Sequence, residues 1–264
     1  MSTAKIQGEL WGARSKDWAE LLEPAWVPVF ERALFHACIK PGAKLLDVGC
    51  GAGGALVIAR KHGAKIAGID ASENLVAVAR ERLPGARIEV GEMEDLPFSN
   101  ESFDIVVGIN SFQFSSNLVR ALCEARRVCR RGGKVFMLTW GRREDCQLMT
   151  ITMPAVLALM PPPSPGSNLP DPAVGESGVK DSMRMAGLEP IESGQFSADL
   201  AFSDTSIAVR AIMSVGTVVR VSRFIGKEFV VEAINGTLRP VTRADGSVVW
   251  RNRFLWVKAT KPAR

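Results

Sequence analysis

A glycine-rich segment after an apolar run at residues 44–49 is the part of the sequence best suited to hold a ligand. Gly49, Gly51 and Gly53 let the backbone turn sharply and lie against a bound molecule, while the helix that follows offers free N–H groups. Asp70 ends the next apolar run, where an acid accepts hydrogen bonds from ribose hydroxyls. Together these residues predict a nucleoside site. We interpret Asp47 as an acid that orients the glycine loop through backbone hydrogen bonds, with direct ligand contact as the alternative.

The segments that must position this site alternate short apolar runs with stretches of helical spacing, which is typical of an α/β protein with a parallel sheet. The predicted parallel strands are residues 44–49, 64–70, 86–90, 103–109 and 133–140. Two later strands, in residues 188–202 and 244–260, predict an antiparallel closure. We therefore expect a doubly wound, seven-stranded, mostly parallel sheet.

The remaining segments suggest how the chain is divided around this core. The expected parts are an N-terminal helical lid (1–43), a ligand-binding core (44–143), a cap over a second substrate (144–187 and 203–240), and the closing strands of the same domain (188–202 and 244–260). Pro24 and Pro28 should break the first part into two short helices. The proline-rich residues 161–172 predict an insertion or lid.

Composition excludes several classes of protein. The chain has 264 residues, of which 47% are hydrophobic and 23% charged, as in a globular protein. Its longest apolar stretch, residues 153–160, is far short of the ~20 residues that a membrane span needs, and the first residues lack a signal sequence. We therefore expect a cytoplasmic protein with no membrane partner.

Charge and reactive side chains narrow the chemistry further. Five cysteines without a C-x-x-C pair and only two histidines, His36 and His62, predict no metal site, and the absence of tyrosine excludes a phenolic base. The net charge of +5 is not concentrated in a basic block, so no nucleic-acid partner is expected. Arg220, Arg223 and Lys227 share a helical face that we interpret as solvated.

Five linked segments between residue 11 and about residue 143 resemble the class I S-adenosylmethionine-dependent methyltransferases, in their small-molecule branch (methyltransferase type 11 like). They are Trp11-Gly12 with Trp18, Leu45 to Gly53, Gly68-Ile69-Asp70, Glu92 to Phe98 before Ser102-Phe103-Asp104, and Arg127-Val128 with Gly132-Gly133-Lys134. Several spaced motifs in order are more specific than one glycine loop.

The resemblance implies a Rossmann-like fold, S-adenosyl-L-methionine as the cofactor and a set of binding residues. Gly49, Gly51 and Gly53 would pass beneath the methionine part, and Asp70, followed by Ala71, would hold the ribose. Glu92 would take the adenine amino group, with Met93 and Glu94 next to it, although relatives have Asp in place of Glu92. Asn110 and Ser111 would lie under the sulfonium, and Trp11 and Trp18 would form an aromatic lid; helix packing is the alternative for both tryptophans.

The expected reaction is in-line methyl transfer to an oxygen, nitrogen or carbon atom of a small organic acceptor, by a monomer or a homodimer. No single catalytic residue is assigned; the candidates are Asn110, Gln113, Trp140, Glu144 and Asp145. Two alternatives remain: a non-catalytic S-adenosylmethionine-binding protein, and an NAD-dependent oxidoreductase, since a glycine turn followed by an acid also describes dinucleotide sites. His36 and His62 are expected to lie away from the site.

Overall fold

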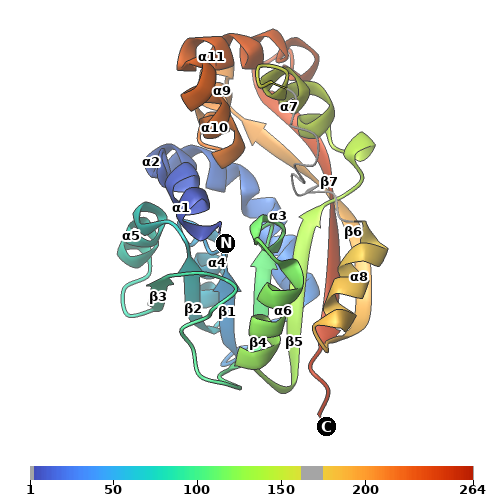
Figure 1. The fold of residues 1–264 in the computed structure, drawn as a ribbon. Helices are drawn as coiled ribbons and strands as arrows, with labels where there is room; N and C mark the ends of the chain where they lie inside the picture. Colours follow the sequence, from blue (N-terminus) through green and yellow to red (C-terminus); the bar gives the residue numbers. More distant parts are fainter. Residues whose placement is uncertain (1–2, 162–174, 264) are drawn as a thin grey trace.

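A seven-stranded sheet forms the centre of the molecule in the computed structural model, which describes residues 3–161 and 175–263 (Figure 1). Its strands are β1 (Lys44–Val48), β2 (Lys65–Asp70), β3 (Arg87–Val90), β4 (Phe103–Ile109), β5 (Cys129–Trp140), β6 (Glu189–Phe202) and β7 (Val248–Thr260), in the order β3-β2-β1-β4-β5-β7-β6. The first five are parallel, whereas β7 runs antiparallel to both of its neighbours. The predicted fold class is confirmed.

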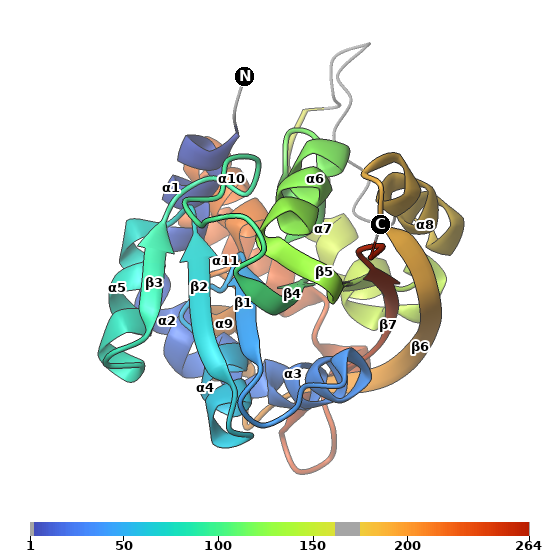
Figure 2. The same ribbon diagram turned by 90° about the horizontal axis from the view of Figure 1, so that it is seen from below.

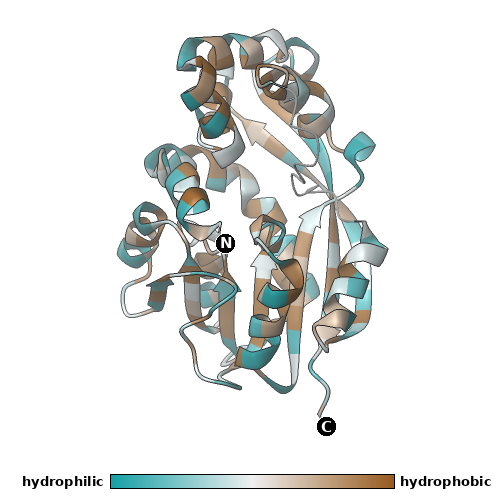
Figure 3. Ribbon diagram, viewed as in Figure 1, coloured by the Kyte–Doolittle hydropathy of each residue, from teal (hydrophilic) through white to brown (hydrophobic). Residues whose placement is uncertain are grey.

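Helices cover both faces of this sheet, as Figure 2 shows from below. One face carries α3 (Glu23–Ala37), α4 (Gly54–Lys61) and α5 (Glu73–Arg82), and the other carries α6 (Leu118–Val128) and α8 (Glu176–Met185). Successive strand residues point to opposite faces, so Leu45 packs in the first layer and Leu46 in the second. Figure 3 shows the result: apolar residues dominate the strands and polar residues the outer helical faces.

The N-terminal helices differ from the sequence prediction. After α1 (Ala4–Gly12), the chain stays helical through α2 (Ser15–Asp17), a π-helical turn η1 (Trp18–Leu22) and α3. Pro24 and Pro28 do not break it, because Pro24 stands in the first turn of α3, just after the π turn has changed the hydrogen-bond register, and Pro28 is accommodated inside α3.

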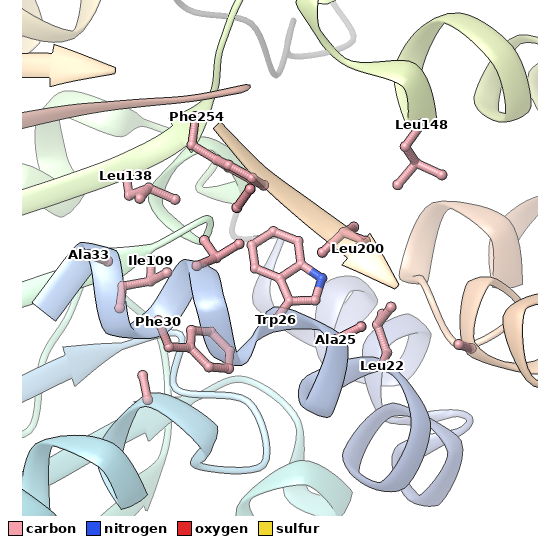
Figure 4. Packing of buried hydrophobic residues seen from close by; sticks show 14 of the residues in the cluster. Leu22, Ala25, Trp26, Phe30, Ala33, Ile109, Leu138, Leu148, Leu200 and Phe254 are labelled. Carbon is pink, nitrogen blue, oxygen red and sulfur yellow. The ribbon is translucent and has the colours of Figure 1, made fainter. Parts of the chain in front are cut away.

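Helix α3 belongs to the core of the protein rather than to a lid. Its Trp26 and Phe30 pack with Ile109, Leu138 and Phe254 from β4, β5 and β7 (Figure 4). The ring centroids of Trp26 and Phe254 are 5.4 Å apart. The predicted N-terminal lid is therefore confined to α1, α2 and η1, residues 4–22, of which Leu22 also packs in this core; we keep the term N-terminal lid as a label for that segment.

A group of helices lies above the carboxyl ends of the parallel strands (Figure 1). It consists of a π-helical turn η4 (Leu148–Thr152), α7 (Met153–Leu157), α9 (Thr205–Ile212), α10 (Gly216–Ile225) and α11 (Lys227–Gly236). We call it the cap. Helix α8, predicted as part of the cap, instead packs in the core layer of α6, because its Val179 and Met183 are buried there. Of the predicted proline-rich insertion or lid, residues 161–172, all but residue 161 lie outside the described residues.

No single described helix is long and apolar enough to cross a membrane. Helices α9 and α10 reach the required length and composition only as a pair, and that pair is bent by 87°.

Candidate active site

The glycine loop connects β1 to α4 at the carboxyl edge of the sheet. Gly49 has a φ of +76°, and a Cβ atom built on it would lie 2.4 Å from the Cβ of Ser111, so only glycine fits. Gly53 has a φ of +85° and precedes the first residue of α4; a Cβ there would approach Leu83 to 3.0 Å. The first glycine therefore brings the loop against the segment that follows β4, and the third brings α4 against α5.

Asp70, at the end of β2, supports this loop from the side. One carboxylate oxygen accepts a hydrogen bond from the Gly51 N–H and the other accepts one from the Ser72 N–H, both at 2.9 Å. Asp47 makes no such bond, and its buried Oδ1 has no hydrogen-bond partner among the described residues. The preferred interpretation of Asp47 is therefore wrong, because Asp70 orients the loop and Asp47 is left free for a ligand.

Glu23, which the sequence analysis missed, is the second acid that holds the loop. Its Oε1 accepts hydrogen bonds from the Ala52 N–H at 3.0 Å and from the Trp18 indole at 3.2 Å, while Oε2 pairs with Arg82 at 2.5 Å. Arg82 also donates to the Ala19 carbonyl at 2.7 Å. This cluster, in which Glu23 is buried and Arg82 reaches solvent, joins the N-terminal lid, the glycine loop and α5.

A pocket lies between the glycine loop, the N-terminal lid, α3 and the end of β4. It encloses about 800 Å³ of empty space, counting the part that opens to solvent. Ten of the predicted cofactor residues line it: Trp11, Trp18, Asp47, Gly49, Gly51, Asp70, Ala71, Met93, Asn110 and Ser111. The structure thus brings together residues from five separate segments of the chain.

Three predicted cofactor residues do not line this pocket. Gly53 packs against α5, as described above. Glu94 borders a smaller adjoining pocket, and its Oε1 accepts hydrogen bonds from the backbone N–H and the hydroxyl of Ser116, both at 2.7 Å, so it fixes the approach to α6. Glu92 lines neither pocket, whereas its neighbour Met93 lines both.

The pocket is acidic, and the described residues that line it include no lysine, arginine or histidine. Burial, together with the negative charges of Asp70 and Glu23, raises the pKa of Asp47 to about 8. Burial also raises the pKa of Glu23, although the positive charge of Arg82 acts in the opposite direction. Burial likewise raises the pKa of Asp70, although hydrogen bonds from Ser72 and Gly51 act in the opposite direction. Such a site favours a cationic ligand, because a positive charge compensates the buried carboxylates.

Aromatic rings close the side of the pocket that faces the N-terminus. Trp11 packs edge-on against Trp18 and Phe114, with centroid distances of 5.2 and 5.1 Å. The cap holds this lid from outside: Arg210 of α9 pairs with Asp17 at 2.7 Å, and Gly216 of α10 lies directly against the Trp11 ring. No cap residue lines either of the two pockets described here, so in this structure the cap supports the lid.

The candidate catalytic residues separate into two groups. Asn110 lines the pocket in a left-handed backbone conformation, φ +56°, and its Oδ1 accepts a hydrogen bond from Gln113 at 2.5 Å. Trp140 lies in the core against Trp26 and lines neither pocket. Glu144 and Asp145 also line neither pocket, and they pair with Arg142 at 3.4 and 3.2 Å.

Both histidines lie outside the two pockets. His36 stacks on Trp256, with ring centroids 4.5 Å apart, at the end of α3. Burial and the positive charges of Arg32 and Lys258 hold its pKa below the usual value. His62 follows α4 and is exposed.

The central part of the chain is similar in sequence to known proteins. Residues 46–137 match the family described as "Methyltransferase domain". An uncharacterised protein of Mycobacterium tuberculosis is 33% identical over 128 residues, which are 47% of this chain and 47% of that protein. A malonyl-[acyl-carrier protein] O-methyltransferase of Serratia marcescens is 33% identical over 111 residues, which are 42% of this chain and 44% of that enzyme. The matched region therefore spans less than half the length of these relatives.

Solved structures agree in fold over a larger part of the chain. One match is a chain from the complex between the Haloferax volcanii Trm112 methyltransferase activator and "the putative methyltransferase". It is 18% identical to this chain with a TM-score of 0.62, and the match covers 99% of each chain. The geranyl diphosphate C-methyltransferase of Streptomyces coelicolor A3(2) is 17% identical with a TM-score of 0.52, covering 89% of this chain and 78% of that enzyme.

The pocket also fits the cofactor of this family on its own chemistry. Gly49 brings the backbone against the cavity, and the free Oδ1 of Asp47 and the raised pKa values of three acids suit a ligand that carries a sulfonium and an ammonium group. Residues 46–137 therefore carry a methyltransferase domain, and the pocket that this segment helps to form suits S-adenosylmethionine.

Proposed function

We propose that the chain transfers the methyl group of S-adenosylmethionine to a small organic acceptor. The observation that carries this proposal is that one pocket is lined both by the glycine loop with Asp70 and by the apolar side chains of Trp26, Phe30 and Ile109. The cofactor supplies a methyl group that its sulfonium already activates. The protein then has mainly to align the acceptor with the methyl group at roughly 3–3.5 Å and to exclude water.

The residues of the pocket have separable tasks in this proposal. Asp70 would hold the ribose with the lone pairs that the N–H groups of Gly51 and Ser72 leave available, since a carboxylate accepts about four hydrogen bonds. Asp47 and Glu23 would face the cationic methionine part. Asn110, whose Oδ1 accepts a hydrogen bond from Gln113, would position the acceptor atom. The N-terminal lid would exclude water.

The charge of the pocket supports an acceptor that is uncharged or cationic and largely apolar. A phosphate or a carboxylate on the acceptor would add negative charge to a pocket whose described lining contains three acids and no basic residue. A phenol, thiol, amine or activated carbon next to an apolar group would instead pack on Trp26 and Phe30. The relatives named above match only in the central region, so their acceptors do not enter this proposal.

Methyl transfer can be tested with a pool of small metabolites incubated with the protein and S-adenosylmethionine, followed by mass spectrometry. We expect one uncharged or cationic compound to gain the mass of a methylene group while S-adenosylhomocysteine accumulates. Cofactor binding without any product over a broad pool would favour the non-catalytic alternative. Preferred methylation of phosphorylated compounds would contradict the proposed acceptor class.

Cofactor identity gives a first prediction. S-adenosylhomocysteine should raise the melting temperature of the protein, because a ligand that binds only the native state stabilises it by mass action; at 100 times its Kd the gain is about 2.7 kcal/mol. NADH, whose two phosphates would face the acids of the pocket, should leave the melting temperature unchanged. Thermal melts with each ligand check this, and stabilisation by NADH alone would support the oxidoreductase alternative.

Methyl transfer without a histidine base gives a second prediction. His36→Ala and His62→Ala should each retain more than about a tenth of wild-type turnover, because neither side chain lines the pockets and a true general base contributes about 10²–10⁴-fold. The pH profile should then follow the ionisation of the acceptor. A hundredfold loss of turnover in either variant, with unchanged cofactor affinity, would contradict this mechanism.

A further inference from the structure

The corner between α10 and α11 exposes an unusual concentration of large apolar side chains. Phe224, Ile225 and Phe229 are 59%, 37% and 57% exposed, and all lie within six residues of one another. The other exposed large apolar side chains of the described residues are dispersed along the chain. Gly226, with a φ of +108°, forms the apex, and the Phe229 ring approaches to 3.5 Å of the position that a Cβ on Gly226 would take. The corner therefore presents a group of apolar side chains to solvent.

Basic residues surround this point. Arg220, Arg223 and Lys227 are exposed, while Glu228 is the one acid between positions 220 and 229. Arg220 and Lys227 have no ion pair or hydrogen bond within the described parts of the chain, so their charges are free to meet a partner. We call residues 220–229 the α10–α11 tip.

We propose that the α10–α11 tip docks on the surface of an anionic lipid bilayer, with Phe224, Ile225 and Phe229 inserted among the lipids and the basic residues against the headgroups. Aromatic and aliphatic side chains flanked by lysine and arginine are the combination that binds such interfaces. The three side chains expose on the order of 300 Å² together, well below the ~800 Å² per partner of a stable protein interface. Apolar side chains of this area, flanked by exposed basic residues, suit insertion into anionic lipid better than pairing with a second copy of the chain.

The tip also lies next to the lid of the pocket. Arg223 Nη2 donates to the Glu9 carbonyl of α1 at 3.4 Å, and the first residue of α10, Gly216, packs against Trp11. Docking through the tip would therefore bring α1 close to the lipid surface. The sequence expectation of no membrane partner rested on the lack of a spanning segment, which a surface contact does not need.

Vesicle binding tests this proposal independently of methyl transfer. The purified chain is sedimented with vesicles of phosphatidylcholine alone and of phosphatidylcholine with phosphatidylglycerol, at low and high salt. We expect binding to the anionic vesicles that weakens at high salt. The double variant Phe224→Ser, Phe229→Ser should bind at least about tenfold more weakly, since it loses most of the inserted apolar surface. Arg220→Glu and Lys227→Glu should each lower binding at least roughly fivefold.

Phe35→Ser is the matched control. Phe35 is 75% exposed near the C-terminal end of α3 and is not part of the α10–α11 tip. It should bind vesicles like the wild type, and thermal melts should show all variants folded. Absence of wild-type binding to anionic vesicles, or full binding by the double variant, would overturn the proposal. A change of molar mass in light scattering caused by the double variant, with vesicle binding unaltered, would assign the tip to a contact between copies of the chain and overturn it as well.

Discussion

Asp70→Ala should weaken the binding of S-adenosylhomocysteine about 10- to 150-fold. A hydrogen bond to a charged group contributes about 1.5–3 kcal/mol, and the variant loses the acceptor for the ribose. The structure adds a second reason, because the same carboxylate holds the N–H groups of Gly51 and Ser72 and thereby the shape of the glycine loop. The melting temperature of the free protein should fall with it. Isothermal calorimetry measures the affinity.

A suitable control is Asp199→Ala, since Asp199 is an exposed residue on β6 and lines neither pocket. It should bind S-adenosylhomocysteine like the wild type. If Asp70→Ala folded normally and kept wild-type affinity, Asp70 would have to be removed from the cofactor site, whatever the fate of the methyl-transfer proposal.

Without cofactor, Asp47 should make the protein less stable as the pH rises from 5 to 8, and Asp47→Asn should remove that loss. Burial raises the pKa of Asp47 to about 8 from a usual 3.8, so the native state keeps a proton that the unfolded state has released. The contribution of Asp47 to the free energy of unfolding is complete below pH 3.8. It falls by about 1.4 kcal/mol per pH unit as the pH approaches 8. Glu23 and Asp70, with raised pKa values, act in the same direction. Urea unfolding at several pH values gives the slope.

Asparagine mimics the protonated carboxyl, so Asp47→Asn should be more stable than the wild type at pH 8 and show a shallower pH dependence. The control is Asp104→Asn. A backbone hydrogen bond from Lys44 and the pairing with Arg130 hold the pKa of Asp104 below its usual value, so its contribution varies only at acid pH. That variant should be less stable by a constant amount between pH 5 and 8. An identical slope for Asp47→Asn and the wild type would show that Asp47 is already ionised.

The parallel strands and the glycine loop could be predicted from the sequence because their signals are local. Apolar runs of strand length, most of them followed by helical spacing, give β1 to β4 within one or two residues, and the positive φ of Gly49 requires the residue type found there. The turn before β7 is equally local: the Arg243 N–H donates to the Ser247 carbonyl at 2.8 Å, as the Asp-Gly pair between them predicts.

What escaped prediction depends on contacts between distant segments. Glu23 is separated by 29 residues from Ala52 and by 59 from Arg82, and nothing near it marks it as buried. Asp47 and Asp70 both follow the expected pattern, yet only packing decides which of them meets the Gly51 N–H. The placement of α8 in the core likewise depends on its contact with α6.

The position of β7 between β5 and β6 has a consequence for how the chain acquires its fold during synthesis. Residues 189–202 leave the ribosome before residues 248–260, yet β6 joins the sheet only through β7. Until the later segment emerges, β5 presents an unpaired edge, and the fourteen-residue β6 has no neighbour to pair with. The nascent protein therefore passes through a stage in which the ligand-binding half is assembled with an open edge, and that stage is where chaperone protection or aggregation would act.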